Sequence, residues 1–396
     1  MSSCSRTEPG THRFEVFDEG GVTVAYTTGG PLHDGPLFEI EPLLVLRQDP
    51  SDPESLLFNP GVFLPGPEGK YYVCDRGSGR VAVYATGGEY LFSFGRKGEG
   101  PGEFRMMKLQ SLSHGILSIF DYTLQRTSLF QTDGTLITTV HSPIGGYALA
   151  LDRTPVGTIL QSGVHMEQDG TTGLTQYSMT VATGTGRDTL RIIRTGLVGD
   201  SVRKVETMPD GSMISVGKTL PFAGSPQITY YPGHGILETD GDRPELTWHD
   251  TNGRSRLHIR IDLPMVPMTA EMKQIVMDRE RANAEQYANR LGRNMLPSDY
   301  DFPDTVGFWC HVTVDDEGWI WCLDVRSHEQ HTEGEPYLWH VIDDEGRYLG
   351  TTGLPSARPR IAAGKVMCFI EDPESGEREA TVFTLRPAVE ELIYPR

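Results

Sequence analysis

The residues best suited to chemistry lie in one short segment, 325–337. It contains His328 and His331, with Glu329 between them and Glu333 and Glu335 after them. Imidazole and carboxylate groups bind divalent metals, and two histidines three residues apart can converge if the loop turns. The alternative is a set of solvated loop side chains, because no His-Glu-x-x-His helix or Cys-x-x-Cys pair fixes a geometry. We expect no bound cofactor, and a divalent metal at His328 and His331 if one binds.

Further polar candidates come from other segments that we expect on the same face of the molecule. One long loop carries His165 and Glu167, and His141 lies at a junction between repeats. Loops on a rigid scaffold commonly hold binding residues. The ligand-binding candidates are His141, His165, Glu167, His311, His328, His331 and Tyr337.

The five cysteines do not form a recognisable disulfide framework. If the tight turn at 315–318 pairs residue 314 with 319, Cys310 and Cys322 lie on opposite faces of a sheet, which predicts free thiols. The opening Met-Ser-Ser-Cys resembles the end of a bacterial lipoprotein signal, in which the cysteine is lipidated. The charged and apolar segments of such a signal are missing, so a lipid anchor at Cys4 and a coincidental cysteine both remain open.

The elements that position these residues are repeated along the chain. Segments 69–91 and 115–137 align without a gap, and a third copy begins at 318 and a looser one at 235. Each copy reads as strand, glycine turn, strand ending in Asp, loop, strand, glycine turn and strand, which predicts a four-stranded antiparallel blade. We expect the pairs Asp75–Arg80 and Asp121–Arg126 to tie the loop between the second and third strands, a structural role.

Weaker copies at 148–195 and 359–386 bring the count to six blades. The last copy lacks a strand, and the apolar run 38–48 can supply it and close the ring. We therefore predict an all-β, six-bladed β-propeller over 12–396, after an N-terminal tail of 1–11. Residues 12–27 form an extra hairpin or edge strand. A helical insertion at about 268–293 separates blades four and five and acts either as a lid or as static packing.

The stretch FSFGRKGEGPGEF at 92–104, after VCDRGSGRVAVY and GEYL, resembles the NHL repeat of six-bladed propellers. It is also similar to bacterial six-bladed propeller proteins, which are often exported or lipid-anchored. That resemblance implies the fold and no common reaction. A phosphate-binding loop at 95–102 is excluded, because no Gly-Lys-Ser/Thr follows and a strand comes next.

Strand parity separates the two faces of such a propeller. The glycine turns share one face; they are at Gly69, Gly88, Gly115, Gly134, Gly253, Gly318 and Gly346. The opposite face collects the long segments 95–104, 163–173, 196–224, 264–305 and 325–337. We expect a protein, peptide or glycan partner to bind this loop-rich face.

The alternative is a metal-assisted lyase, or a lactonase or other hydrolase, with its site in the central channel. Aligned inner-strand positions are Val62, Lys108 and His311, of which one is a good metal ligand, and no Gly-x-Ser-x-Gly elbow is present. A binding protein is therefore favoured over an enzyme. The aromatic residues of the fifth repeat suit a core between blades better than a ligand platform, with Tyr337 the most exposed.

Composition sets outer limits on function. The chain has 35 basic and 54 acidic side chains, a formal charge of −19, which disfavours nucleic acid and anionic membranes as partners. With 45 glycines and 27 prolines a mostly helical fold is disfavoured, and no apolar run is long enough for a transmembrane segment. We expect a monomer. Its location is the cell envelope, periplasmic or extracellular, if an upstream signal was removed, and otherwise the cytoplasm.

Overall fold

The structure is a computed structural model. It describes residues 11–395 except 114, 142–146, 154–158, 169–174, 185–200, 208–212, 220, 226, 232–233, 251–253, 292–301 and 372–377. Across these residues the fold is mainly antiparallel β-sheet, and six of its sheets have three or more strands. We number these six sheets 1 to 6 in chain order. None of the helices in this part of the chain is long and apolar enough to cross a membrane.

Sheets 1, 2 and 5 each contain four consecutive strands. Sheet 1 consists of β4 (Pro60–Pro65), β5 (Tyr71–Asp75), β6 (Arg80–Tyr84) and β7 (Tyr90–Phe94). Sheet 2 consists of β10 (Met107–Ser113), β11 (Ile116–Asp121), β12 (Arg126–Gln131) and β13 (Leu136–His141). Sheet 5 consists of β25 (Trp309–Val314), β26 (Ile320–Asp324), β27 (Tyr337–Ile342) and β28 (Tyr348–Leu354). These are the three sheets that the sequence copies at 69, 115 and 318 predicted.

The other sheets depart from this pattern. Sheet 3 consists of β14 (Tyr147–Arg153), β15 (Ile159–Gln168) and β16 (Thr175–Gly184). Sheet 4 consists of β19 (Gln227–Tyr231), β20 (Gly235–Thr239), β21 (Glu245–His249) and β22 (Ser255–Ile261), extended by β2 (Val22–Thr28) and β1 (Arg13–Glu19). Sheet 6 consists of β29 (Arg360–Ala362), β30 (Lys365–Glu371), β31 (Arg378–Pro387) and β3 (Phe38–Val45). The N-terminal run therefore completes the last sheet, as expected, because β3 pairs with β31.

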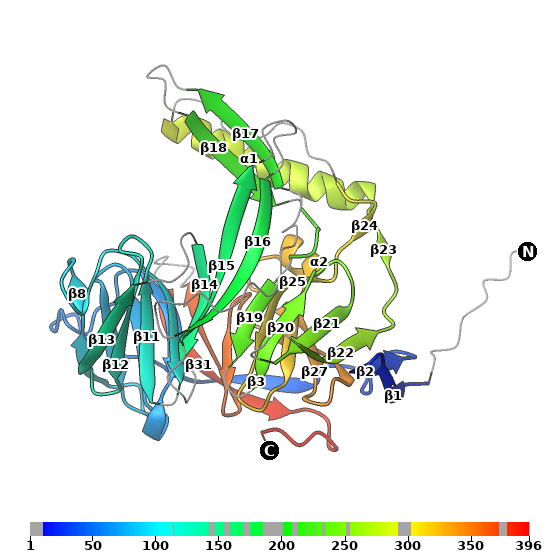
Figure 1. Cartoon of the computed structure of the whole chain (residues 1–396), viewed down its shortest axis with the longest axis horizontal. Coiled ribbons are helices and arrows are strands. Elements are labelled where there is room, and N and C mark those ends of the chain that lie inside the picture. Colours follow the sequence, from blue (N-terminus) through cyan, green and yellow to red (C-terminus); the bar gives the residue numbers. More distant parts are fainter. Residues whose placement is uncertain are drawn as a thin grey trace, which may run out of the picture.

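Two-stranded sheets and short and long helices complete the secondary structure of the described residues. The two-stranded pairs are β8 (Arg96–Lys97) with β9 (Glu103–Phe104), β17 (Ser201–Thr207) with β18 (Met213–Thr219), and β23 (Val266–Pro267) with β24 (Thr305–Val306). The helices are η1 (Pro67–Gly69), α1 (Ala270–Leu291) and α2 (Val325–Glu329). In Figure 1, β15 and β16 rise from the body toward β17, β18 and α1.

Apolar faces of neighbouring sheets form the core. Sheets 1 and 2 share a cluster around Phe104 and Phe130, and sheets 4 and 5 share one around Trp248 and Trp309. Two more clusters join sheet 5 to sheet 6 and sheet 6 to sheet 1, while β14 lies beside β10 and β19. Each large side chain buried in this way contributes roughly 1.5–3 kcal/mol. This face-to-face packing of antiparallel sheets is propeller-like.

Glycine turns connect the strands where predicted. Gly88 and Gly134 turn β6 into β7 and β12 into β13 with φ of +86° and +87°, a backbone conformation that side chains with a Cβ rarely adopt. Gly134 is also crowded, because a Cβ there would lie 2.9 Å from the Phe94 ring of sheet 1. The turn at 253 lies outside the described residues.

Several expectations about local structure were wrong. Val314 pairs with Ile320, not with residue 319, and Cys310 forms a β-bulge between Trp309 and His311. The expected free thiols are nevertheless observed at Cys310 and Cys322. Segment 163–173 is not a loop at its start, since β15 continues to Gln168, and 196–224 contains β17 and β18.

The helix α1 begins as predicted, with the Thr269 hydroxyl accepting from the backbone N–H of Met272 at 3.2 Å. Val276 is fully buried in a cluster with Val306 of β24 and Val325 of α2. This packing agrees with the static alternative for the first turns of α1. The aromatic residues of sheet 5 are core, as expected: Trp309, Trp319, Trp321 and Trp339 are at most 2% exposed.

Candidate functional site

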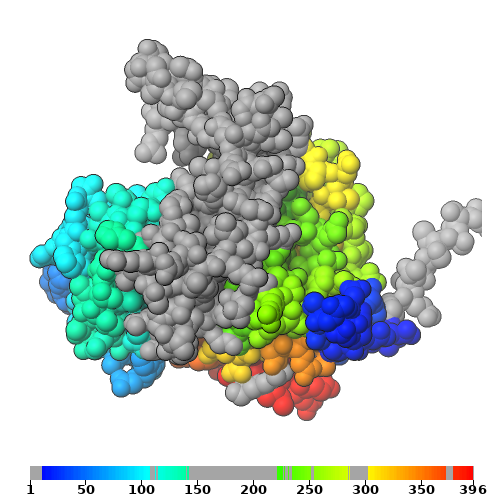
Figure 2. Space-filling model, viewed as in Figure 1, coloured from blue at the N-terminus to red at the C-terminus, as the bar shows by residue number. Residues whose placement is uncertain are grey.

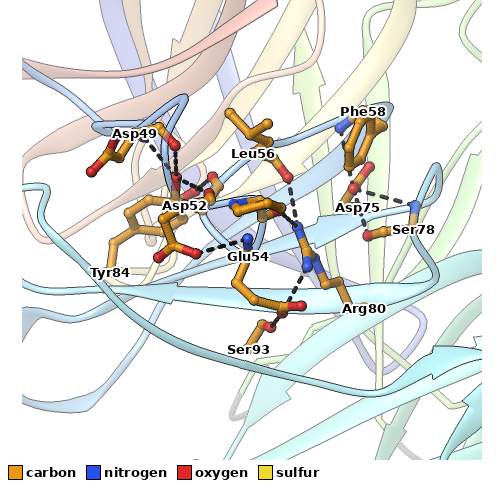
Figure 3. Close-up of polar contacts among 12 residues, drawn as sticks. Asp49, Asp52, Glu54, Leu56, Phe58, Asp75, Ser78, Arg80, Tyr84 and Ser93 are labelled. Atoms are coloured by element: carbon orange, nitrogen blue, oxygen red, sulfur yellow. Dashed lines mark hydrogen bonds and ion pairs between the residues drawn. The ribbon is translucent and has the colours of Figure 1, made fainter.

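The aspartates that end the second strands hold loops, but not by pairing with the arginines. Asp75 accepts hydrogen bonds from the backbone N–H groups of Asn59 at 2.7 Å and Gly77 at 3.0 Å, and from the Ser78 hydroxyl at 2.6 Å. The same carboxylate therefore closes the loop after β5 and fixes the segment that enters β4 (Figure 3). Asp121 likewise accepts from the N–H groups of Arg105 and Leu124.

The side-chain contacts expected between Asp75 and Arg80 and between Asp121 and Arg126 are not formed. Each arginine instead binds the segment that leads into the first strand of its sheet. Arg80 donates to Glu54 at 2.8 Å and to the Leu56 carbonyl at 2.8 Å, so it binds the segment before β4 (Figure 3). Arg126 donates to the carbonyl of Gly100 at 2.6 Å, in the glycine-rich connection from sheet 1. In each sheet the arginine points to the incoming segment, whose carbonyl groups accept its hydrogen bonds. The aspartate contacts and the arginine contacts therefore both have a structural role.

The sequence candidates of sheet 5 do come together. His311 belongs to β25, His328 to α2, Tyr337 to β27, and His331 lies just after α2. Arg358, which precedes β29 of sheet 6, is close enough to perturb the pKa values of His311 and His328. We call these five residues the α2 site.

Two imidazoles flank the Tyr337 ring. The His331 ring stacks on it with centroids 3.7 Å apart and planes 10° apart, and the His328 ring lies 6.2 Å away at 32°. Such contacts use the faces of the rings, whereas metal ligation needs nitrogen lone pairs that converge on one point. Among the described residues, no group of three or more His, Cys, Asp or Glu could hold a metal ion. A metal at His328 and His331 thus has no further protein ligand in this part of the chain.

Two histidines of the α2 site, His311 and His328, have lowered pKa values. Burial lowers the pKa of His311 to about 4, with further lowering from the positive Arg358 and from His328. Burial also lowers the pKa of His328, and the opposing effect of Glu329 does not cancel it. The Arg358 guanidinium is exposed, and no described residue forms a hydrogen bond or an ion pair with it. The site is therefore an aromatic and imidazole surface beside one unpaired cation.

A series of hydrogen-bonded, buried side chains holds the N-terminus of α2 in place. Asp324 caps the helix by accepting from the N–H of Ser327 at 3.0 Å, and it accepts from Arg326 at 2.9 Å. The buried His340 places Nε2 3.2 Å from Asp324 and Nδ1 2.9 Å from the hydroxyl of Tyr348. Burial raises the pKa of Asp324, but the hydrogen bonds from His340 and Arg326 outweigh it and hold that pKa well below its usual range.

Three of the remaining candidates, His141, His165 and Glu167, belong to strands other than those of the α2 site. His141 is exposed at the end of β13 in sheet 2. His165 and Glu167 lie on β15, opposite Ser178 and Gln176, and their side chains lie outside the described part of the structure, as does Cys4. Sequence reasoning missed His340 and Arg358. The strand-ending Asp324 was the available signal for the hydrogen-bonded, buried side chains, and no sequence signal marked Arg358.

Comparisons with known proteins support the fold. Neither a protein-family model nor a curated protein matches the sequence. A protein from Bacteroides fragilis NCTC 9343 that is predicted to be exported superposes with a TM-score of 0.52 and 12% identity, over 91% of this chain and 99% of that one. A DUF4221 family member from Bacteroides vulgatus gives 0.47 and 9%, over 96% and 100%. A calcium-binding regucalcin from Agrobacterium tumefaciens gives 0.36 and 12%, over 87% and 94%. The chain therefore has a mostly β, propeller-like fold similar to that of the Bacteroides fragilis protein.

Proposed function

We propose that this protein is a six-bladed, NHL-like β-propeller that binds a protein, peptide or glycan partner through its loop-rich face. Each of sheets 1 to 6 is one blade, and β3 closes the ring by completing the last. The observation that carries the proposal is the α2 site, where the ring of a half-buried tyrosine contacts two imidazoles and an arginine without an ion-pair partner lies nearby. Aromatic faces with a nearby cation suit sugars, aromatic side chains and acidic groups.

The helix α2 holds this surface in place. Its N-terminus is fixed by Asp324, and Glu329 at its end forms an ion pair with Arg279 of α1. Leu338, next to Tyr337, donates its N–H to the Ser327 hydroxyl at 2.7 Å. A surface held from three sides is preorganised, which reduces the entropy lost on binding.

The test is a binding screen of the whole protein against glycan and peptide arrays, followed by titration of each hit. Tyr337→Ala should weaken a genuine hit by tenfold or more, whereas Tyr337→Phe keeps the stacked ring and should retain most of the affinity. Arg358→Gln removes the cation of the α2 site. Its matched control is Arg386→Gln, which removes an exposed arginine that pairs with Glu41 of the outer strand β3. Hits unaffected by all α2 site variants would contradict the proposed site.

The lyase or hydrolase alternative depends on His311, a half-buried imidazole with a lowered pKa on the inner strand β25. Turnover of a lactone or a related substrate that is lost on chelation and on His311→Gln would favour it over binding alone. We also propose export with a lipid anchor at Cys4, which is tested by fatty-acid labelling of the protein in bacterial cells and of its Cys4→Ser variant.

A further inference from the structure

The outermost strand of sheet 4, β1, is an open edge. It lies at the end of the strand order, so no described strand pairs with its outer side. Val16 is 57% and Phe17 40% exposed. In Figure 2 this N-terminal hairpin lies at the surface, at the margin of the molecule. An open edge with exposed apolar side chains is a template for another strand.

Four of the other outer strands are interrupted, whereas β1 is regular, as is β16 of sheet 3. A β-bulge breaks the pairing of the outer strand in sheets 1, 2, 5 and 6, that is in β7, β13, β28 and β3. Bulges of this kind protect edges from further pairing. All seven residues of β1 pair with β2 in one uninterrupted register, and β1 contains no proline.

The hairpin register shows which backbone groups of β1 point outward. Glu19 pairs with Val22 across the two-residue turn Gly20–Gly21, both at positive φ. The pair that closes such a turn exchanges both hydrogen bonds, and bonded pairs alternate along the strand. Phe14, Val16 and Asp18 therefore direct their N–H and C=O groups away from β2.

We propose that this edge pairs with β1 of a second copy of the chain, antiparallel and centred on Val16. This register pairs Val16 with Val16 and Phe14 with Asp18, so all three outward residues of each copy form hydrogen bonds. It also sets Arg13 of each copy opposite Glu19 of the other, which makes the two ends of the strand pair complementary in charge.

The alternative registers are worse. Centring on residue 15 sets Glu15 against Glu15, and centring on residue 17 sets Glu15 against Glu19, which are like charges in both cases. Centring on residue 18 sets Asp18 against Asp18, two like charges in direct opposition. Centring on residue 14 leaves Asp18 opposite residue 10, beyond the end of the strand. The sequence alone suggested a monomer because the regularity of this edge is not visible without the fold. One strand pair buries little surface, so the dimer dissociates on dilution, as small interfaces do.

Sedimentation of the full chain over a range of concentrations tests the proposal, with Val16→Pro as the breaking variant. The Val16 N–H points outward, so proline in each copy removes both hydrogen bonds of the central Val16–Val16 pair while the hairpin keeps its own. We expect the wild type to pass from one to two chains as concentration rises, and Val16→Pro to stay a monomer with an unchanged melting temperature. A wild type that remains monomeric, or a Val16→Pro variant that remains dimeric, overturns the proposal.

A disulfide measures the register directly, in a Cys4→Ser background. Two Val16→Cys residues face each other at a Cα separation of about 5.5 Å, within disulfide range. Two Phe17→Cys residues are about 8 Å apart, beyond that range. Mild oxidation should cross-link Val16→Cys at least tenfold faster. Equal rates, or faster cross-linking of Phe17→Cys, contradict this pairing. Ligand binding at the α2 site is a separate measurement, so either proposal can fail alone.

Discussion

Sheet 5 buries one aspartate at each end of β26, and the two behave in opposite ways. Asp315, at the glycine-turn end, is 4% exposed, and Asp324, at the α2 end, is 5% exposed. Burial raises the pKa of Asp315 to about 6 despite hydrogen bonds from Trp321 and Tyr394. The pKa of Asp324 lies well below its usual range. Equal burial therefore does not set the charge state.

The difference lies in the partners. Asp315 accepts only from neutral donors, namely the Trp321 indole at 2.8 Å, the Tyr394 hydroxyl at 2.8 Å and the backbone N–H groups of Glu317 and Trp319. Asp324 instead faces the His340 ring, with Nε2 at 3.2 Å, and the Arg326 guanidinium at 2.9 Å. Donors that can carry positive charge stabilise a carboxylate more than neutral hydrogen bonds do. At the glycine-turn end of sheet 5 the aspartate thus holds the C-terminal tail through neutral hydrogen bonds. At the α2 end the aspartate is stabilised as a carboxylate.

Removal of the Asp324 carboxylate should have the largest effect. Asp324→Ala leaves His340 without its partner and α2 without its cap, so the free energy of unfolding should fall by about 3–5 kcal/mol. Chemical denaturation measures this. Arg326→Gln is the control, because Arg326 is partly exposed and its loss should cost under about 1 kcal/mol. Equal losses in the two variants would show that the cation dominates the site.

The pH dependence of stability should distinguish the two aspartates. The folded pKa of Asp315 exceeds the unfolded value of 3.8, so its stabilising contribution is complete below about pH 4 and is lost as pH rises to about 6. The shift of about two units corresponds to roughly 3 kcal/mol. The stability of the wild type relative to Asp315→Asn should fall by that amount between pH 4 and 7, as measured by urea denaturation.

The matching variant at the α2 end should give the opposite sign. The depressed pKa of Asp324 means that its contribution is present above about pH 4 and is lost only as pH falls through the folded value. The stability of the wild type relative to Asp324→Asn should therefore stay level between pH 5 and 7 and decline in acid. A downward slope with rising pH for both aspartates would refute the comparison.

Tyr394→Phe tests the turn end by itself, with a smaller effect. The Tyr394 hydroxyl donates to Asp315, and its ring packs on Trp319 at 4.8 Å and Phe38 at 5.2 Å. Phenylalanine keeps the ring contacts, so only the hydrogen bond is lost, at about 1–3 kcal/mol near pH 7. The loss should shrink near pH 4, where Asp315 is protonated. A pH-independent loss would mean that Asp315 is not charged in the folded protein at pH 7.

The repeated parts of the fold were predictable from the sequence, and the irregular parts were not. Glycine turns and strand-ending aspartates recur at fixed spacing, so sheets 1, 2 and 5 could be predicted from local chemistry. The register of β25 could not, because the turn to β26 holds one residue more than the spacing indicates, and the bulge at Cys310 shifts the register a second time. Bulges depend on how neighbouring sheets pack, which spacing does not encode.

The candidate site was predictable only within one segment. His328, His331 and Tyr337 are close in sequence, and they meet in the fold. Asp324 and His340 meet across neighbouring strands, after an insertion whose length hides the pairing. Arg358 lies in the connection from β28 of sheet 5 to β29 of sheet 6, so its proximity to His311 depends on how this connection is placed between two sheets. Strand parity placed the loops on one face but could not pair side chains from different sheets.

The smallest expected effect tests that contact at the α2 end. Arg358 is the second cause, after burial, that lowers the pKa of His311. Arg358→Gln removes the charge, so the pKa of His311 should rise by less than one unit while remaining below that of a solvated histidine, because the ring stays buried. Nuclear magnetic resonance titration of the imidazole measures this, with Arg386→Gln as a control that should leave it unchanged. An unaltered His311 in the Arg358→Gln variant would separate sheet 6 from the α2 site and leave Tyr337 and its two flanking imidazoles as the whole binding surface.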